Sequence, residues 1–277
     1  MRVEPTKPGI AAYERFLIAR DGEPDLLRHT LSEREATYTR LAEHPVTSAF
    51  RPDREQYLRN IARRRPEDGL DRRMLWLLAT AKSNQAERFA IGLAEVYGRM
   101  HVGGENRILL HVHLQETYHT RILADVVSLF GLPVLARPPA LLVRLFIKRL
   151  VFAPPQWILP LTGASEMVGC VFFRALRDVG CELFADEPAV ADRIRVLYDE
   201  ILSDEIGHVG YIAALLGPAG RRLMRKLYVL LAPRLVRQMA ELRELCSDAE
   251  WAKRLGDFRL DEMVDDCGGL AYAASTI

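Results

Sequence analysis

Two short segments of the chain repeat one pairing of residue types that can bind a metal ion. QETYHTR places Glu116 three residues before His119, and SDEIGHVGY places Glu205 three residues before His208. Side chains three positions apart share one face of an α-helix. Leucine, valine and isoleucine flank both pairs at helical spacing, so each pair faces a core, where a charged side chain needs a compensating partner.

Two more glutamates are expected at the same level of the protein. Both helices of an antiparallel hairpin rise equally per residue, so side chains that meet lie about equally far from the turn. Glu166 and Glu205 lie equally far from a predicted turn beside Pro188. Glu87 and Glu116 lie equally far from the earlier turn HVGGEN. The spacing thus predicts four carboxylates and two imidazoles at one level.

Each of the two single glutamates has a competitor in its own helix. Glu95 shares its face with two arginines, as in a solvated ion pair, whereas Glu87 neighbours small and apolar side chains. This favours Glu87 but leaves the choice open. Glu182 would lie too near the turn, whereas the residues around Glu166 are small and leave space beside it.

The rest of the chain predicts the helices that must position these residues. Apolar residues recur at spacings of three and four over long stretches, and no segment shows the sustained alternation of a strand. We expect helices over about 71–100, 105–130 and 188–217, and another somewhere within 160–183. The prediction is an all-α protein in which two helical hairpins are joined by one long crossover, residues 131–160.

The flanks of this core, which spans residues 70–217, are expected to extend it. Segments 1–69 and 218–277 also contain helical patterns, and no Gly/Ser-rich linker separates them from the core. The patterns cover residues 12–44, 54–65 and 221–246. We therefore expect residues 1–277 to form a single domain with additional N- and C-terminal helices.

Composition excludes several classes of protein. The 277 residues include 38 Lys and Arg against 37 Asp and Glu, and a net charge of +1 provides no general field for nucleic acid. The four cysteines form no Cys-x-x-Cys pair, which argues against a zinc ribbon. The N-terminal MRVEPTKPGI has no apolar signal, and no uncharged stretch reaches the roughly 18 residues of a membrane span. We expect a cytoplasmic protein with reduced thiols.

The combined residue set resembles the ferritin-like superfamily of di-iron and di-manganese carboxylate proteins. In these bundles two helices contribute one Glu each and two contribute Glu-x-x-His. The resemblance covers roughly residues 70–217 and implies a four-helix bundle that holds two iron ions, with manganese or a mixed pair as alternatives. It also implies that Glu116 and Glu205 bridge the ions, one held by Glu87, Glu116 and His119, the other by Glu166, Glu205 and His208.

Three neighbouring residues gain candidate roles. In several families of this superfamily an acid at the place of Asp204 orients a ligand histidine, the alternative here being a surface aspartate. Some N-oxygenating members use extra histidines, which makes His113 a candidate ligand, although a hydrogen-bonded core histidine is favoured. Cys170 lies one turn after Glu166 and either lines the pocket or serves as a small buried hydrophobe.

The resemblance implies oxidation chemistry with dioxygen. Radical-generating reductase subunits carry a tyrosine four residues after the first ligand histidine, and Leu123 at this position disfavours that class. The long flanks favour an enclosed pocket. We therefore expect a di-iron monooxygenase or oxidase that uses dioxygen, an electron donor and a small substrate, either apolar or bound to a carrier. A homodimer is compatible with this.

Other classes remain open. A ferroxidase or other metal-handling ferritin-like protein would use iron itself as substrate. A membrane-associated quinone-type hydroxylase would use the basic crossover, residues 138–160, to rest on a bilayer. A packed crossover is favoured, so membrane contact is not expected. The remaining alternative is a helical interaction protein without a metal.

Overall fold

The computed structural model describes residues 8–25, 27–63, 65–101, 107–135, 149, 152–275 and 277. The described chain is predominantly helical, and its strands form one two-stranded antiparallel pair, Pro24–Asp25 with Thr30–Leu31. The predicted all-α class is confirmed.

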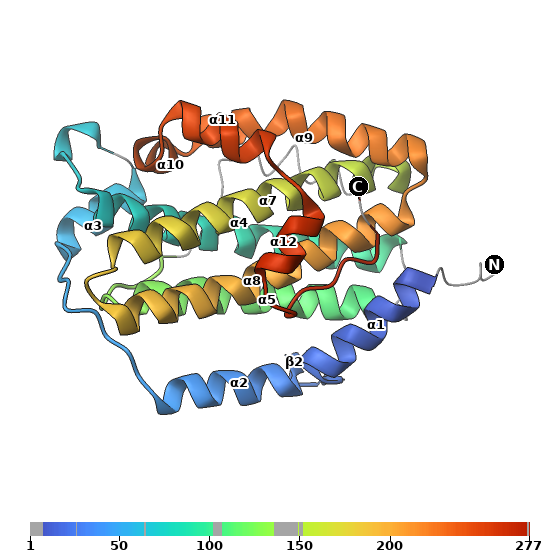
Figure 1. Ribbon diagram of the computed structural model, residues 1–277, viewed down its shortest axis with the longest axis horizontal. Helices are drawn as coiled ribbons and strands as arrows, with labels where there is room; N and C mark the ends of the chain where they lie inside the picture. Colours follow the sequence, from blue (N-terminus) through green and yellow to red (C-terminus); the bar gives the residue numbers. More distant parts are fainter. Residues whose placement is uncertain are drawn as a thin grey trace.

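Four long helices lie side by side at the centre of the molecule (Figure 1). α4 packs on α5 and α7 on α8, while contacts between α5 and α8 and between α4 and α7 join the two hairpins. The bounds of these helices are Arg72–His101 for α4, Arg107–Ser128 for α5, Pro155–Leu183 for α7 and Pro188–Leu215 for α8.

Both hairpins are antiparallel and have the expected register. The Asn84 side chain on α4 donates a hydrogen bond to the Thr120 carbonyl on α5. On the other hairpin, the Cys181 thiol of α7 donates to the Ala191 carbonyl of α8 at 3.4 Å. Each pair lies about equally far from its turn, so glutamates equally far from the turns also come level.

Helix α7 begins earlier than the sequence predicts. It starts at Pro155 and contains Pro160 in its first turns. A proline near the start of a helix is tolerated because the N–H groups of the first turn lack helical acceptors. α5 and α7 run in the same direction (Figure 1), so the chain between them joins opposite ends of the bundle. Half of the predicted crossover, residues 136–148 and 150–151, lies outside the described residues.

Among the described helices, α7 alone is long and apolar enough to cross a membrane, over Gln156–Leu183. Half of the apolar 18-residue stretch that meets this criterion is buried within the protein. The core helix of a water-soluble protein meets the same criterion, and α7 packs on both α8 and α9 (Pro218–Gln238). Its length and composition are therefore weak evidence for a membrane span.

The N-terminal flank packs against α5 and α8. The helical pattern expected over residues 12–44 is interrupted, because α1 (Pro8–Asp21) ends at Gly22, which has a φ of +80°. The short strand pair comes next, and α2 (Ser32–Glu43) begins directly after it. α3 (Arg54–Ala62) then packs on α4.

The C-terminal flank covers the other side of the bundle (Figure 1). α9 packs along α7, and three shorter helices contact α4, α7, α8 and α9. These helices are α10 (Ala240–Leu245), α11 (Asp248–Gly256) and α12 (Leu260–Asp266).

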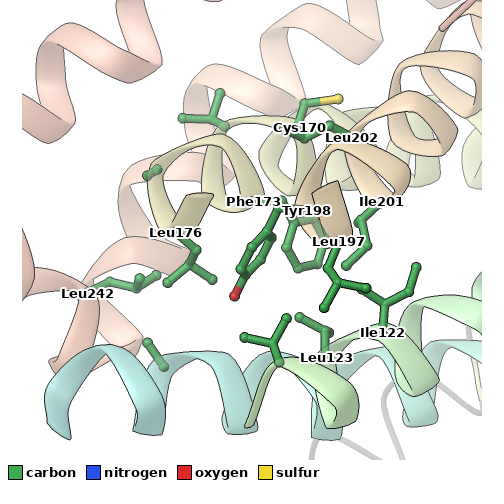
Figure 2. Close-up of a cluster of buried hydrophobic side chains, with 14 of the residues drawn as sticks. Ile122, Leu123, Cys170, Phe173, Leu176, Leu197, Tyr198, Ile201, Leu202 and Leu242 are labelled. Carbon is green, nitrogen blue, oxygen red and sulfur yellow. The ribbon is translucent and has the colours of Figure 1, made fainter. Parts of the chain in front are cut away.

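An apolar layer fills the interior between the central helices. Figure 2 shows Phe173 and Leu176 of α7 meeting Tyr198 and neighbouring residues of α8. The Tyr198 hydroxyl forms a hydrogen bond with the Thr80 hydroxyl at 2.9 Å, so the buried phenol is satisfied. Leu123 of α5 is completely buried in this layer.

Candidate metal centre

The four central helices bring all six predicted ligands together inside the bundle. The side chain of Glu166 is the most exposed of the six, with 19% of its surface accessible, and that of His119 is fully buried. Each helix contributes at least one residue: Glu87 from α4, Glu116 and His119 from α5, Glu166 from α7, and Glu205 and His208 from α8.

These residues form two overlapping groups, each of which can hold a cation. Within each group, one ligand atom per residue lies within 4.8 Å of every other. Glu205 belongs to both groups. The first group is Glu87, His119 and Glu205, and the second is Glu116, Glu166, Glu205 and His208.

Glu116 also lies between the two histidines. Its Oε2 atom is 3.6 Å from Nδ1 of His119, and its Oε1 atom is 3.1 Å from Nδ1 of His208. Glu205 Oε1 is 3.5 Å from the same His119 nitrogen. The two glutamates expected to bridge are thus the ones placed between the halves of the cluster.

Both histidines direct Nδ1 toward the carboxylates and use Nε2 elsewhere. His119 Nε2 donates to Asp204 Oδ2 at 3.1 Å, and His208 Nε2 donates to the amide oxygen of Gln115 at 3.0 Å. Neither Nδ1 atom has a hydrogen-bond partner among the described residues, although both are buried. A proton on Nε2 leaves the Nδ1 lone pair available, which is the tautomer that ligates a metal through Nδ1.

An ion-pair network from the N-terminal flank lies behind the histidines. Arg34 of α2 donates to both oxygens of Asp204 at 2.7 Å, and Arg20 of α1 also pairs with Asp204. Burial alone would raise the pKa of Asp204, but the two arginines hold it well below its usual range. Asp204 is 1% exposed, so the surface-aspartate interpretation is wrong.

Without a cation, protons balance the charge of the cluster. Burial raises the pKa of Glu87 to about 7. Burial and the neighbouring carboxylates of Glu166 and Glu116 raise the pKa of Glu205 well above its usual range. Burial would lower the pKa of His208, but Glu116 and Glu166 raise it to about 9. A bound cation would take the place of these protons.

Small and apolar residues surround the cluster on α7. A Cβ atom on Gly169 would lie 2.7 Å from Glu205 Oε2, so glycine leaves the room that this carboxylate occupies. The Phe173 ring lies 6.5 Å from the His119 ring. Cys170 is fully buried among apolar side chains (Figure 2), as expected for a small core hydrophobe.

The remaining candidates belong to neither ligand group or lie outside the described residues. His113 is half-buried on α5 and belongs to neither ligand group. Glu182 lies at the surface and pairs with Arg72 at 3.1 Å. The side chain of Glu95 is outside the described residues, whereas Glu87 Oε2 lies 3.6 Å from His119 Nδ1.

Sequence reasoning missed Gln115 and the network residues of α1 and α2. Gln115 precedes Glu116 just as Asp204 precedes Glu205, and this repeated position was a signal that could have identified it. Arg20, Asp21 and Arg34 carry no such signal, because only tertiary contacts of α1 and side-chain hydrogen bonds of α2 bring these helices against α5 and α8.

Comparisons with known proteins add no family assignment. No protein-family model, curated protein or solved structure matches the chain. The resemblance to ferritin-like proteins therefore rests on the residues themselves.

Proposed function

We propose that the six residues hold two metal ions and that the protein is a ferritin-like, dioxygen-dependent oxidoreductase. The observation that carries this proposal is the pair of buried Nδ1 atoms, on His119 and His208, that face carboxylates without a hydrogen-bond partner among the described residues. Leaving a buried polar atom unpaired is costly. A cation bound to each nitrogen would remove that cost.

The chemistry of the donor set favours iron, with manganese or a mixed pair as alternatives. Each half offers one imidazole nitrogen together with carboxylate oxygens. Such mixed nitrogen and oxygen sites suit these ions, whereas sites rich in thiolates suit zinc or Fe–S clusters. The bundle with one long connection between α5 and α7 supports the ferritin-like arrangement.

When bound, two ferrous ions would supply electrons for the reduction of dioxygen. The protein's own residues would set the surroundings of that reaction. Asp204 and Gln115 fix the histidine tautomers, while Phe173 and the apolar layer limit the access of water from the bundle interior. Among the six ligands, Glu87 of α4 and Glu166 of α7 are the most exposed, so these two helices carry the side of the centre that is nearest to solvent. A small organic molecule is the proposed substrate, and an external donor would supply the electrons.

Anaerobic loading with ferrous iron followed by exposure to oxygen tests the proposal. We expect about two iron ions per chain and new near-ultraviolet and visible absorption when oxygen is admitted. Glu116→Ala should lose both the iron and the absorption change. The matched control is Glu182→Ala, which removes a glutamate from the surface of the same bundle and should leave both intact. Equal behaviour of the two variants would contradict the assignment.

A further inference from the structure

The groups that hold the two histidines are not equivalent. His119 donates its Nε2 proton to a carboxylate, Asp204, and His208 donates its Nε2 proton to an amide, Gln115. The two partners occupy the same position in their helices, one residue before the glutamate of the Glu-x-x-His pair. The ligand sets are thus related by position, but one histidine has a charged partner and the other a neutral one.

The partner of His119 is held as an anion. Arg34 donates to both Asp204 oxygens at 2.7 Å, and this planar, bidentate geometry is typical of a strong arginine–carboxylate pair. Arg20 adds a second cation to the same carboxylate. All three side chains are buried or nearly so, which limits screening by solvent.

The partner of His208 is held as an oriented amide. The Gln115 side-chain nitrogen donates to Asp21 Oδ2 at 2.8 Å, which directs the amide oxygen toward His208. Arg20 and Arg34 donate to the same Asp21 carboxylate, so one network fixes both histidine partners. Gln115 can therefore set the tautomer of His208 without adding negative charge.

We infer that the two halves bind metal with unequal affinity and that the first divalent cation occupies the His119 half. This inference rests on the proposed function, because it requires that the cluster bind metal. An imidazole that donates to a carboxylate is a more basic ligand than one that donates to an amide, and such partner groups change metal affinity by about 10- to 100-fold. If the number of carboxylates determined the affinity, the first cation would instead occupy the His208 half. The group around His208 contains three glutamates, and the group around His119 contains two.

Two matched variants distinguish these orders in a calorimetric titration with Mn²⁺ alone. His208→Ala should retain a first binding step within about 3-fold of the wild-type dissociation constant, and His119→Ala should weaken that step by at least about 10-fold. Equal losses, or a greater loss in His208→Ala, would overturn the inference. A wild-type protein that binds neither Mn²⁺ nor Fe²⁺ would instead overturn the proposed function.

A second pair of variants tests the cause. Asp204→Asn should weaken the first step by about 10-fold, whereas Gln115→Ala should weaken the second and leave the first unchanged. Because Asp204→Asn leaves two buried arginines with one anion fewer, circular dichroism must show that it remains folded. If Asp204→Asn unfolds, the comparison of His119→Ala with His208→Ala still shows which half binds the first ion. If Asp204→Asn and Gln115→Ala weaken the same binding step, the difference between the carboxylate and the amide partner is not the cause of the unequal affinities.

Discussion

At the scale of single residues, the position of the Nε2 proton determines what each histidine can bind. Asp204 and Gln115 accept that proton, so the Nδ1 atoms of His119 and His208 face four carboxylates and would ligate a cation once it displaces the protons that the cluster holds without metal. The same two nitrogens have no hydrogen-bond partner among the described residues. Hydrogen bonds outside the cluster thus orient both imidazoles as the proposed metal centre requires.

Gly169 provides a test of how closely the carboxylates must fit. In Gly169→Ala the new methyl group would contact Glu205 Oε2, which must then move away from the shared position between the two groups. We expect metal affinity to fall by about 10-fold or more while the helix itself remains intact, since alanine favours helix. Titration with Mn²⁺ measures the affinity, and circular dichroism monitors the fold. Unchanged affinity would show that Glu205 is not confined at this position.

The protons of the cluster predict a pH dependence of metal binding. Because burial raises the pKa of Glu87 to about 7, and Glu116 and Glu166 raise that of His208 to about 9 against the effect of burial, both groups carry protons that metal must displace. Affinity for Mn²⁺ should therefore rise as the pH increases from about 6 to about 9. A pH-independent affinity would contradict this.

The metal-free protein should show the opposite trend in stability. A group whose pKa is higher in the folded state contributes stability below its unfolded pKa and loses that contribution as the pH rises through the folded value. For His208 this window runs from 6.5 to about 9, and for Glu87 from 4.5 to about 7. Thermal unfolding with a chelator present should give a falling Tm across these windows. A Tm that rises across both windows would show that these protons are not bound in the folded state.

At the scale of helices, each hairpin places its ligands and the N-terminal flank supports them. Trp76 of α4 donates a hydrogen bond from Nε1 to the Leu176 carbonyl of α7 at 2.7 Å, and its ring lies over Gly180. This contact joins the two hairpins. On the other side, α1 and α2 bring Arg20, Asp21 and Arg34 to the histidine partners.

The contact between α4 and α7 should be sensitive to a single methyl group. A Cβ on Gly180 would lie 2.5 Å from the Trp76 ring, which is buried against Phe130, Phe184 and Tyr198 and has little freedom to move. We expect Gly180→Ala to lower the free energy of unfolding by about 1–3 kcal/mol, as overpacking does in cores. Urea denaturation of the metal-free protein measures this loss.

A second glycine in a helix serves as the control. A Cβ atom on Gly256, at the end of α11, would meet no described residue within 4 Å apart from its own turn of helix. Gly256→Ala should change the free energy of unfolding by no more than about 0.5 kcal/mol. Similar losses in the two variants would mean that the Trp76 contact is not what makes Gly180 necessary.

At the scale of the whole molecule, the sequence predicted the features that helical periodicity determines. Glu87 and Glu116, and likewise Glu166 and Glu205, lie at equal distances from their turns, and this spacing alone predicted that all four meet at one level. The start of α7 at Pro155 was missed because prolines inside the first turns of a helix look like breaks in the pattern. The break at Gly22 was missed because the periodicity resumes in α2.

The long-range ion pairs could not be predicted in this way. Arg34 and Asp204 are 170 residues apart, and nothing in the pattern of either helix indicates that they meet. Their pairing depends on how the N-terminal flank packs on α5 and α8, which is set by tertiary contacts. The flanks are thus part of the site's construction, because they hold the residues behind both histidines.

Metal analysis of the purified protein tests the central claim most directly. After reconstitution with ferrous iron under anaerobic conditions and removal of loosely bound metal, the proposal predicts about two ions per chain. Glu116→Ala should then contain substantially less iron than both the wild type and Glu182→Ala. Fewer than about one ion per wild-type chain, unchanged by reconstitution with iron or manganese, would contradict the claim that this cluster is a metal centre.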